Sequence, residues 1–347
     1  MSFRFDADVG RPQSYEEHIV DITGGNMPVV KWRHTPDETD FDDGAAFGII
    51  RGAILEQNND PQRLRRVAVE LAALLPSYRP SDAVLTSVWN LFVSLAQQTP
   101  SGNIAMLDLV VILDQLSSSP KTTATVTVDG FDQLSRLHGL NRSIVDGMAC
   151  KSSITTPLHN PEIGGRGGST RPSLSPDMRS QKAPYRPSAR TDTLTRWINL
   201  NAFAALLWSY NLIDGRDFAI QQLRSAFEDR RSADAGDRGG ADARLMAAAQ
   251  WAIHSCQRLY HLSVTSEAAS PAEARVHAAK GGEKADERWR PGARFKGRAG
   301  FSFRRWEFWQ QGFEEAHEFG GGGVEAKVEA GAAAGMMEKV LYAGFEV

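Results

Sequence analysis

The segment from residue 288 to residue 306 holds the residue types that most directly suggest a binding chemistry. It contains seven basic and five aromatic residues and no acidic residue. Guanidinium and ammonium groups neutralise phosphates and carboxylates, and aromatic rings stack on bases or on arginine planes. The segment is therefore a candidate patch for an anion or a partner, formed by Arg290, Arg294, Lys296, Arg298, Arg304 and Arg305.

The sequence leaves three interpretations of this basic and aromatic segment open. Its residues can pack against one another inside the fold, bind an anion or a phosphorylated partner, or bind nucleic acid. We favour internal packing, because arginine often stacks on tryptophan within proteins. We do not expect nucleic acid to be the partner, since the whole chain has a net charge of −3 and lacks the positive excess that attracts a polyanion.

Tryptophans on the expected C-terminal helices supply a second candidate site. Their spacings of three and eleven residues place pairs of rings on one helix face. Converging rings would line a cavity for a hydrophobic small molecule, with Asn199 and Asn201 as its polar groups. The simpler interpretation is a packed core in which these asparagines hydrogen-bond across helices. The pocket candidates are Trp197, Asn199, Asn201, Trp208, Trp251, Trp306 and Trp309.

The common catalytic and phosphate-binding motifs are absent from the sequence. His254, Arg258 and His261 share one helix face, whereas Cys256 points elsewhere. Two histidines and an arginine need carboxylates from another element to hold a metal, so we predict no metal site and no cofactor. We expect a non-enzymatic interaction or scaffold protein with a protein partner. An enzyme or binding protein for a hydrophobic metabolite is the alternative.

The elements that must position these residues are helices. Between residues 41 and 149 apolar residues recur at helical spacing, and helix starts near 61, 81 and 102 lie about twenty residues apart. Similar patterns follow Asp192 and Ser302, and no βαβ series appears. We predict an all-α fold, an antiparallel helical array and bundle with long flexible insertions. Residues 122–128 fit a short strand, and residues 131–140 fit a helix.

Composition divides the chain into four regions. They are an acidic N-terminal arm (1–40), an N-terminal helical region (41–149), a linker rich in Ser, Pro, Gly and Arg (150–190), and a C-terminal helical bundle (191–347) with loops at 231–240, 263–300 and 320–323. The linker has too few apolar residues to offset the entropy of ordering it. It is either a tether or an error in the gene model.

The N-terminal residues lack the basic and apolar pattern of a secretory signal, and no apolar run is long enough to cross a bilayer. The two cysteines, Cys150 and Cys256, cannot build a disulfide framework. We therefore expect a cytoplasmic or nuclear protein that does not bind membranes.

Five segments of the C-terminal half carry a resemblance to a known family. They are RWINLNAFAA (196–205), AIQQLRSAFE (219–228), AAAQWA (247–252), SFRRWEFWQQGF (302–313) and AAAGMM (332–337). Together they resemble a family of uncharacterised filamentous-fungal proteins that share a helical domain of unknown function. The resemblance is best over about 190–340 and weaker over 41–117. It implies a helical, intracellular protein, and it implies no activity and no catalytic residue.

Overall fold

The computed structural model describes part of the 347-residue chain. The described residues are 14–17, 30–33, 41–55, 62–77, 80–128, 131–149, 189–229, 238–268 and 289–343. Helices dominate these residues, which confirms the prediction of an all-α fold. Most of the acidic arm, residues 151–188 of the expected linker and residues 230–237 and 269–288 lie outside the described residues.

Five α-helices form the N-terminal half of the described chain. They are α1 (Asp43–Leu55), α2 (Arg63–Leu74), α3 (Asp82–Gln98), α4 (Ile104–Leu116) and α5 (Leu140–Ala149). Side chains cap three of them as helix caps usually do. The Oδ1 atom of Asp42 accepts from the Ala45 amide at 2.8 Å, Ser81 Oγ accepts from the Val84 amide, and Asn103 caps α4. Asp42 and Ser81 are thus the N-caps of α1 and α3.

Six α-helices form the C-terminal half of the described chain. They are α6 (Ala189–Ser209), α7 (Arg216–Leu223), α8 (Arg238–His254), α9 (Cys256–Ala268), α12 (Phe303–Glu318) and α13 (Val324–Ala343). A π-helical turn, η3 (Arg224–Glu228), extends α7. Ser302 caps α12, as predicted, by accepting from the Arg305 amide.

Two small antiparallel pairs of strands accompany the helices. β1 (Ser14–Glu17) pairs with β2 (Val30–Arg33) inside the expected acidic arm. β3 (Ala124–Val128) pairs with β4 (Phe131–Ser135), and Val128 lies opposite Phe131. The helix predicted at 131–140 is therefore wrong. The sequence Asp129-Gly130 between the two strands is a common two-residue hairpin connection, which the helical interpretation overlooked.

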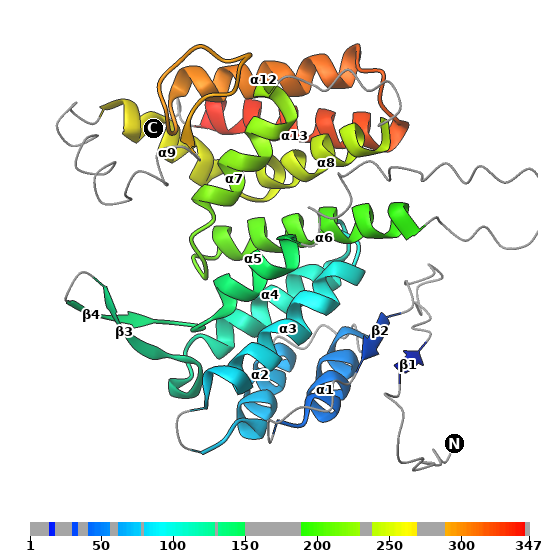
Figure 1. The fold of residues 1–347 in the computed structure, drawn as a ribbon, viewed down its shortest axis with the longest axis vertical. Coiled ribbons are helices and arrows are strands. Elements are labelled where there is room, and N and C mark those ends of the chain that lie inside the picture. Colours follow the sequence, from blue (N-terminus) through cyan, green and yellow to red (C-terminus); the bar gives the residue numbers. More distant parts are fainter. Residues whose placement is uncertain are drawn as a thin grey trace, which may run out of the picture.

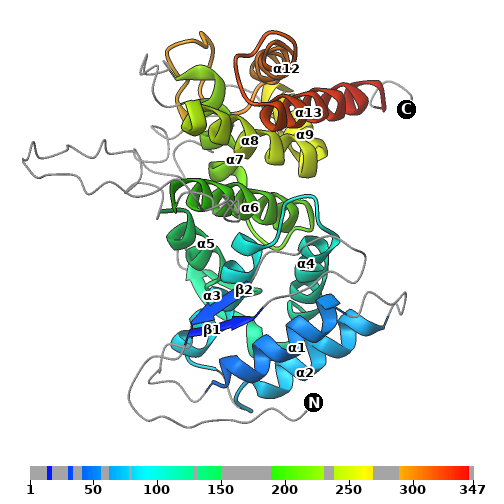
Figure 2. The same ribbon diagram turned by 90° about the vertical axis from the view of Figure 1, so that its right-hand side faces the viewer.

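Helix α6 lies between the two halves (Figures 1 and 2), where it contacts α3, α4 and α5 on one side and α8 on the other. Its side chains are apolar around most of the circumference, and Leu200, Phe203 and Leu207 are fully buried. A helix that is apolar on all sides is stable only when it is enclosed. One continuous hydrophobic core accordingly runs from Phe41 to Met337 through α6.

The chain between the loops expected at 231–240 and 263–300 forms two helices, α8 and α9, with a bend at Ser255. Ser255 Oγ donates to the carbonyl of Ala205 in α6 at 2.6 Å, so the bend is held against α6. Helix α9 also continues to Ala268, into the loop expected at 263–300. Among the described residues, no helix combines the length and hydropathy needed to cross a bilayer.

Candidate functional site

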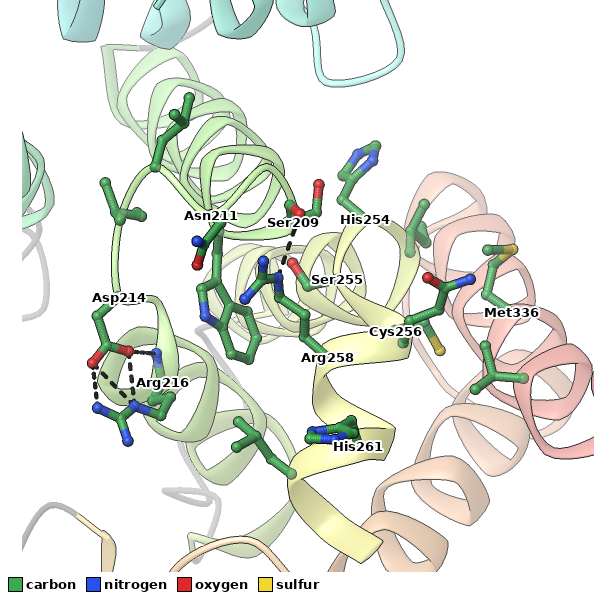
Figure 3. Close-up of a pocket in the computed structure, with 17 residues that line it drawn as sticks. Ser209, Asn211, Asp214, Arg216, His254, Ser255, Cys256, Arg258, His261 and Met336 are labelled. Carbon is green, nitrogen blue, oxygen red and sulfur yellow. Dashed lines mark hydrogen bonds and ion pairs between the residues drawn. The ribbon is translucent and has the colours of Figure 1, made fainter. Parts of the chain in front are cut away.

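A pocket of about 980 Å³ opens at the bend between α8 and α9 (Figure 3). Its walls come from the end of α6, the connection 210–215, the α8–α9 bend and α13. The lining residues are Trp208, Ser209, Asn211, Leu212, Ile213, Asp214, Arg216, Ile253, His254, Ser255, Cys256, Gln257, Arg258, His261, Leu262, Met336 and Val340. This volume lies in the range of small-molecule sites.

The connection 210–215 turns tightly at one wall of the pocket. Asn211 has a φ of 62°, and its amide donates to Trp208 O while the Leu212 amide donates to Leu207 O. This is a Schellman cap, in which asparagine is one of the few residues that tolerate left-handed backbone. At Gly215 a Cβ atom would lie 2.6 Å from Trp208 Cγ, so only glycine lets the chain pass the indole.

One ion pair occupies the rim of the pocket beyond this turn. Arg216 Nε lies 2.9 and 3.0 Å from the two carboxylate oxygens of Asp214, and Figure 3 shows the two side chains facing each other. Burial alone would raise the pKa of Asp214. Hydrogen bonds from Arg216 and the positive charges of Arg216 and Arg258 outweigh burial, so the pKa lies below its ordinary value of 3.8.

Burial shifts the pKa values of two groups in the pocket that could do acid–base or nucleophilic chemistry. Burial lowers the pKa of His254 from 6.5 to about 4 and raises the pKa of the Cys256 thiol from 9.0 to about 12. The nucleophile of cysteine chemistry is the thiolate, which Cys256 does not form near neutral pH. The hydroxyl of Ser255 is already committed to Ala205.

The second candidate region is the basic segment, defined here as residues 289–304. It is held by Arg305, which is fully buried and forms an ion pair with the fully buried Glu228 at 2.7 Å. Arg305 also donates to the carbonyls of Trp289 and Gly300 at 3.0 and 2.8 Å. The amide of Gly292 donates to Glu228 Oε2 at 2.8 Å. Hydrogen bonds from residues near both ends of the basic segment therefore hold it against the buried Glu228–Arg305 pair.

Aromatic rings complete the interior of the basic segment. The guanidinium carbon of Arg305 lies 5.3 Å from the centre of the Trp309 ring and 5.7 Å from that of Phe295. Trp309 Nε1 donates to Glu228 Oε1 at 2.7 Å. Phe301 packs edge-on against Trp309. Arg305, Phe295, Phe301 and Trp309 therefore lie inside the fold.

The remaining five cations of the candidate patch lie outside the fold. Their side chains are exposed, and in the part of the chain that the structure describes they form no ion pair. They are Arg290, Arg294, Lys296, Arg298 and Arg304. The structure thus separates the six candidates: Arg305 is buried with Glu228, and the other five face solvent.

The structure places the predicted tryptophan pocket residues in different surroundings. Among the seven candidates only Trp208 lines the described pocket. Trp251, Trp306 and Trp309 are fully buried in the main core, and Trp197 belongs to a small separate cluster.

The two candidate asparagines make hydrogen bonds within the fold. Asn201 Oδ1 accepts from Trp251 Nε1 at 3.0 Å, and its amide donates to Trp197 O. Asn199 donates to the carbonyl of Gln97 at 3.0 Å and so joins α6 to α3.

Sequence reasoning missed most of the pocket. Helical spacing groups His254, Arg258 and His261 on one face but places Cys256 elsewhere. It gives no signal for Asp214 and Arg216, which lie on another element. The bend at Ser255 brings Cys256 into the same wall. Within the described ranges no group of three or more His, Cys, Asp or Glu side chains could hold a metal ion.

Fold and site together define a mainly helical protein with a central buried helix, a pocket lined by polar and apolar side chains, and an exposed basic segment. The chain belongs to the family described as "Protein of unknown function (DUF3632)", whose model matches residues 89–313. This match confirms the resemblance to a helical domain of unknown function. No curated protein and no solved structure matches the chain significantly.

Proposed function

We propose that this chain is a non-enzymatic interaction protein that binds an acidic protein partner through the basic segment. The observation that carries the proposal is the combination of five exposed cations with a buried ion pair that fixes the loop bearing them. A segment held in one conformation loses little entropy on binding, so its charges are presented at low cost. Exposed charges of one sign also steer an oppositely charged partner and speed its association.

A binding role is supported by the raised pKa of the Cys256 thiol, the lowered pKa of His254 and the hydrogen bond that occupies the Ser255 hydroxyl. A cytosolic or nuclear location fits a free thiol at Cys256, because thiols stay reduced there. The alternative, an enzyme or carrier for a hydrophobic metabolite, now depends on the pocket at the α8–α9 bend. The buried tryptophans offer it little support, since Trp208 is the one candidate that reaches that pocket.

The direct test is binding of a fluorescein-labelled polyglutamate peptide, followed by fluorescence anisotropy over a range of salt concentrations. In the test variant the five exposed cations are replaced by glutamine: Arg290, Arg294, Lys296, Arg298 and Arg304. The matched control removes the same charge from five exposed cations elsewhere: Arg65, Arg66, Arg136, Arg142 and Lys339.

The test variant should bind the peptide at least about tenfold more weakly than the unmodified protein, whereas the control should bind it normally. Binding should weaken with added salt, as for any exposed charge contact. Equal losses in both variants would contradict the proposal. Tighter binding of a labelled DNA duplex than of the peptide would replace the acidic protein partner with nucleic acid.

A further inference from the structure

The pocket at the α8–α9 bend contains one more positive charge than its own side chains neutralise. Its charged groups are Asp214, Arg216 and Arg258, together with the titratable His254, His261 and Cys256. The carboxylate of Asp214 is occupied on both oxygens by Arg216. Cys256 stays a neutral thiol. The charge of Arg258 acts on Asp214 from a distance, but Arg258 forms no ion pair in the part of the chain that the structure describes.

The hydrogen bonds of Arg258 are also incomplete. In the part of the chain that the structure describes, its guanidinium makes one hydrogen bond, from Nε to the carbonyl of Ser209, at the long distance of 3.4 Å. Figure 3 shows this group pointing to Ser209, with the ring of His254 directed away from it. A guanidinium has five N–H donors in a planar fork that matches a carboxylate. Its two terminal nitrogens are left for a ligand.

Part of the pocket wall is apolar. Leu262 follows Arg258 by one turn of α9, and Met336 and Val340 lie one turn apart on α13. Leu212 and Ile213 line another part of the pocket, from the connection after α6. A ligand that fits must carry both an anionic group and an apolar body.

The walls are held in place before any ligand arrives. The Schellman cap at Asn211 and the glycine at 215 fix the connection after α6, and the Ser255–Ala205 hydrogen bond fixes the α8–α9 bend. A preformed site does not spend binding energy on ordering its own walls.

We infer that this pocket binds a small organic carboxylate with an apolar chain or ring. The carboxylate pairs with the terminal nitrogens of Arg258, and the apolar part lies against Leu262, Met336 and Val340. None of the five exposed cations of the basic segment lines the pocket. The inference is therefore independent of the proposed partner-binding role.

The experiment is isothermal titration calorimetry with decanoate and with 1-decanol, which has the same chain without the charge. The test variant is Arg258→Gln, and the matched control is Arg142→Gln on the exposed face of α5. A third variant, Val340→Trp, fills the apolar wall. Circular dichroism and thermal unfolding establish that each variant is folded. Arg258→Lys retains the charge and replaces the glutamine variant if that variant does not fold.

We expect decanoate to bind at a single site and Arg258→Gln to weaken it at least about tenfold, the scale of a lost charge-assisted contact. Arg258→Lys should retain part of the affinity. Arg142→Gln should leave decanoate binding unchanged, and 1-decanol should bind the unmodified protein and Arg258→Gln equally. Val340→Trp should abolish binding of both compounds.

The inference is overturned if decanoate does not bind, if Arg258→Gln binds it normally, or if Val340→Trp leaves binding intact. The variant lacking the five exposed cations should still bind decanoate. Loss of peptide binding and loss of decanoate binding therefore report separately on the two proposals.

Discussion

Glu228 and Arg305 are 77 residues apart in the sequence and form an ion pair in which neither side chain is exposed. Trp309, Gly292 and the carbonyls of Trp289, Arg290 and Gly300 satisfy the remaining donors and acceptors of the pair. A buried ion pair is tolerated when its hydrogen bonds are complete, because desolvation of the two charges is otherwise too costly. The pair therefore fixes η3, the basic segment and α12 relative to one another.

Replacing Glu228 with glutamine should destabilise the protein severely. The substitution retains the shape of the side chain but leaves the guanidinium of Arg305 buried without an anion. Removal of one partner from a buried pair typically costs about 3–5 kcal/mol. Urea unfolding followed by circular dichroism measures this loss as a reduced free energy of unfolding. Asp192→Asn is the control, since it breaks an exposed pair with Arg196 and should cost less than about 1 kcal/mol. Similar losses in both variants would contradict the central role assigned to Glu228.

Two glycines should respond oppositely to alanine. At Gly292 an added Cβ would lie 2.5 Å from the carbonyl carbon of Glu228, so Gly292→Ala must displace the loop from the buried pair. At Gly335 in α13 nothing lies within 4 Å of the added atom, and alanine has the better helix propensity by about 1 kcal/mol. Thermal unfolding should show a lower midpoint for Gly292→Ala and a higher one for Gly335→Ala. A tolerated Gly292→Ala would mean that the loop is not held closely against η3.

Two fully buried tryptophans differ in the hydrogen bonding of their indole nitrogens. Trp251 Nε1 donates to Asn201, whereas Trp306 Nε1 has no partner among the described residues. Trp251→Phe should therefore destabilise the protein by about 1–3 kcal/mol more than Trp306→Phe, because Asn201 Oδ1 loses its donor inside the core. Chemical denaturation of the two variants gives the difference directly. Equal values would show that the Asn201 contact contributes nothing to stability.

His254 should make the folded state sensitive to mild acid. Burial lowers its pKa from 6.5 to about 4, so between these pH values the unfolded chain binds a proton that the folded protein does not. Stability is then lost as the pH falls from 6.5 towards 4, by up to about 1.4 kcal/mol per pH unit. His254→Gln should remove this part of the pH dependence when unfolding is measured at pH 7 and pH 5. Parallel pH profiles for the two proteins would argue against a buried neutral histidine.

The helical elements were the most predictable part of the protein, because their signals are local. The caps at Asp42, Ser81 and Ser302 and the apolar periodicity around them depend on residues a few positions apart. Local signals predicted only one strand of the hairpin formed by β3 and β4, because strand pairing depends on both segments. The sequence predicts a strand at 122–128, and the structure has one at 124–128. Its partner, Phe131–Ser135, lies in the range 131–140 that fits a helix, and its pairing with β3 makes it a strand.

The candidate sites were less predictable, because proximity in the sequence does not decide which side chains meet. Spacing suggested that tryptophans could share a cavity, yet Trp251 and Trp306 are enclosed in the core. Six neighbouring cations looked equivalent, yet Arg305 is the one that turns inwards to Glu228. The bend at Ser255 could not be foreseen from α8 and α9 alone, because it depends on a hydrogen bond to α6.

The helical character of the chain, the starts of most helices and the cluster of positive charge among aromatic rings are all visible in the sequence. The helices follow from backbone capping and hydrophobic periodicity, which act over a few residues. The tertiary structure sets which of those charges is buried and which remain on the surface. It also formed the pocket around Arg258, because α6, α9 and α13 meet there only after the common core has enclosed α6.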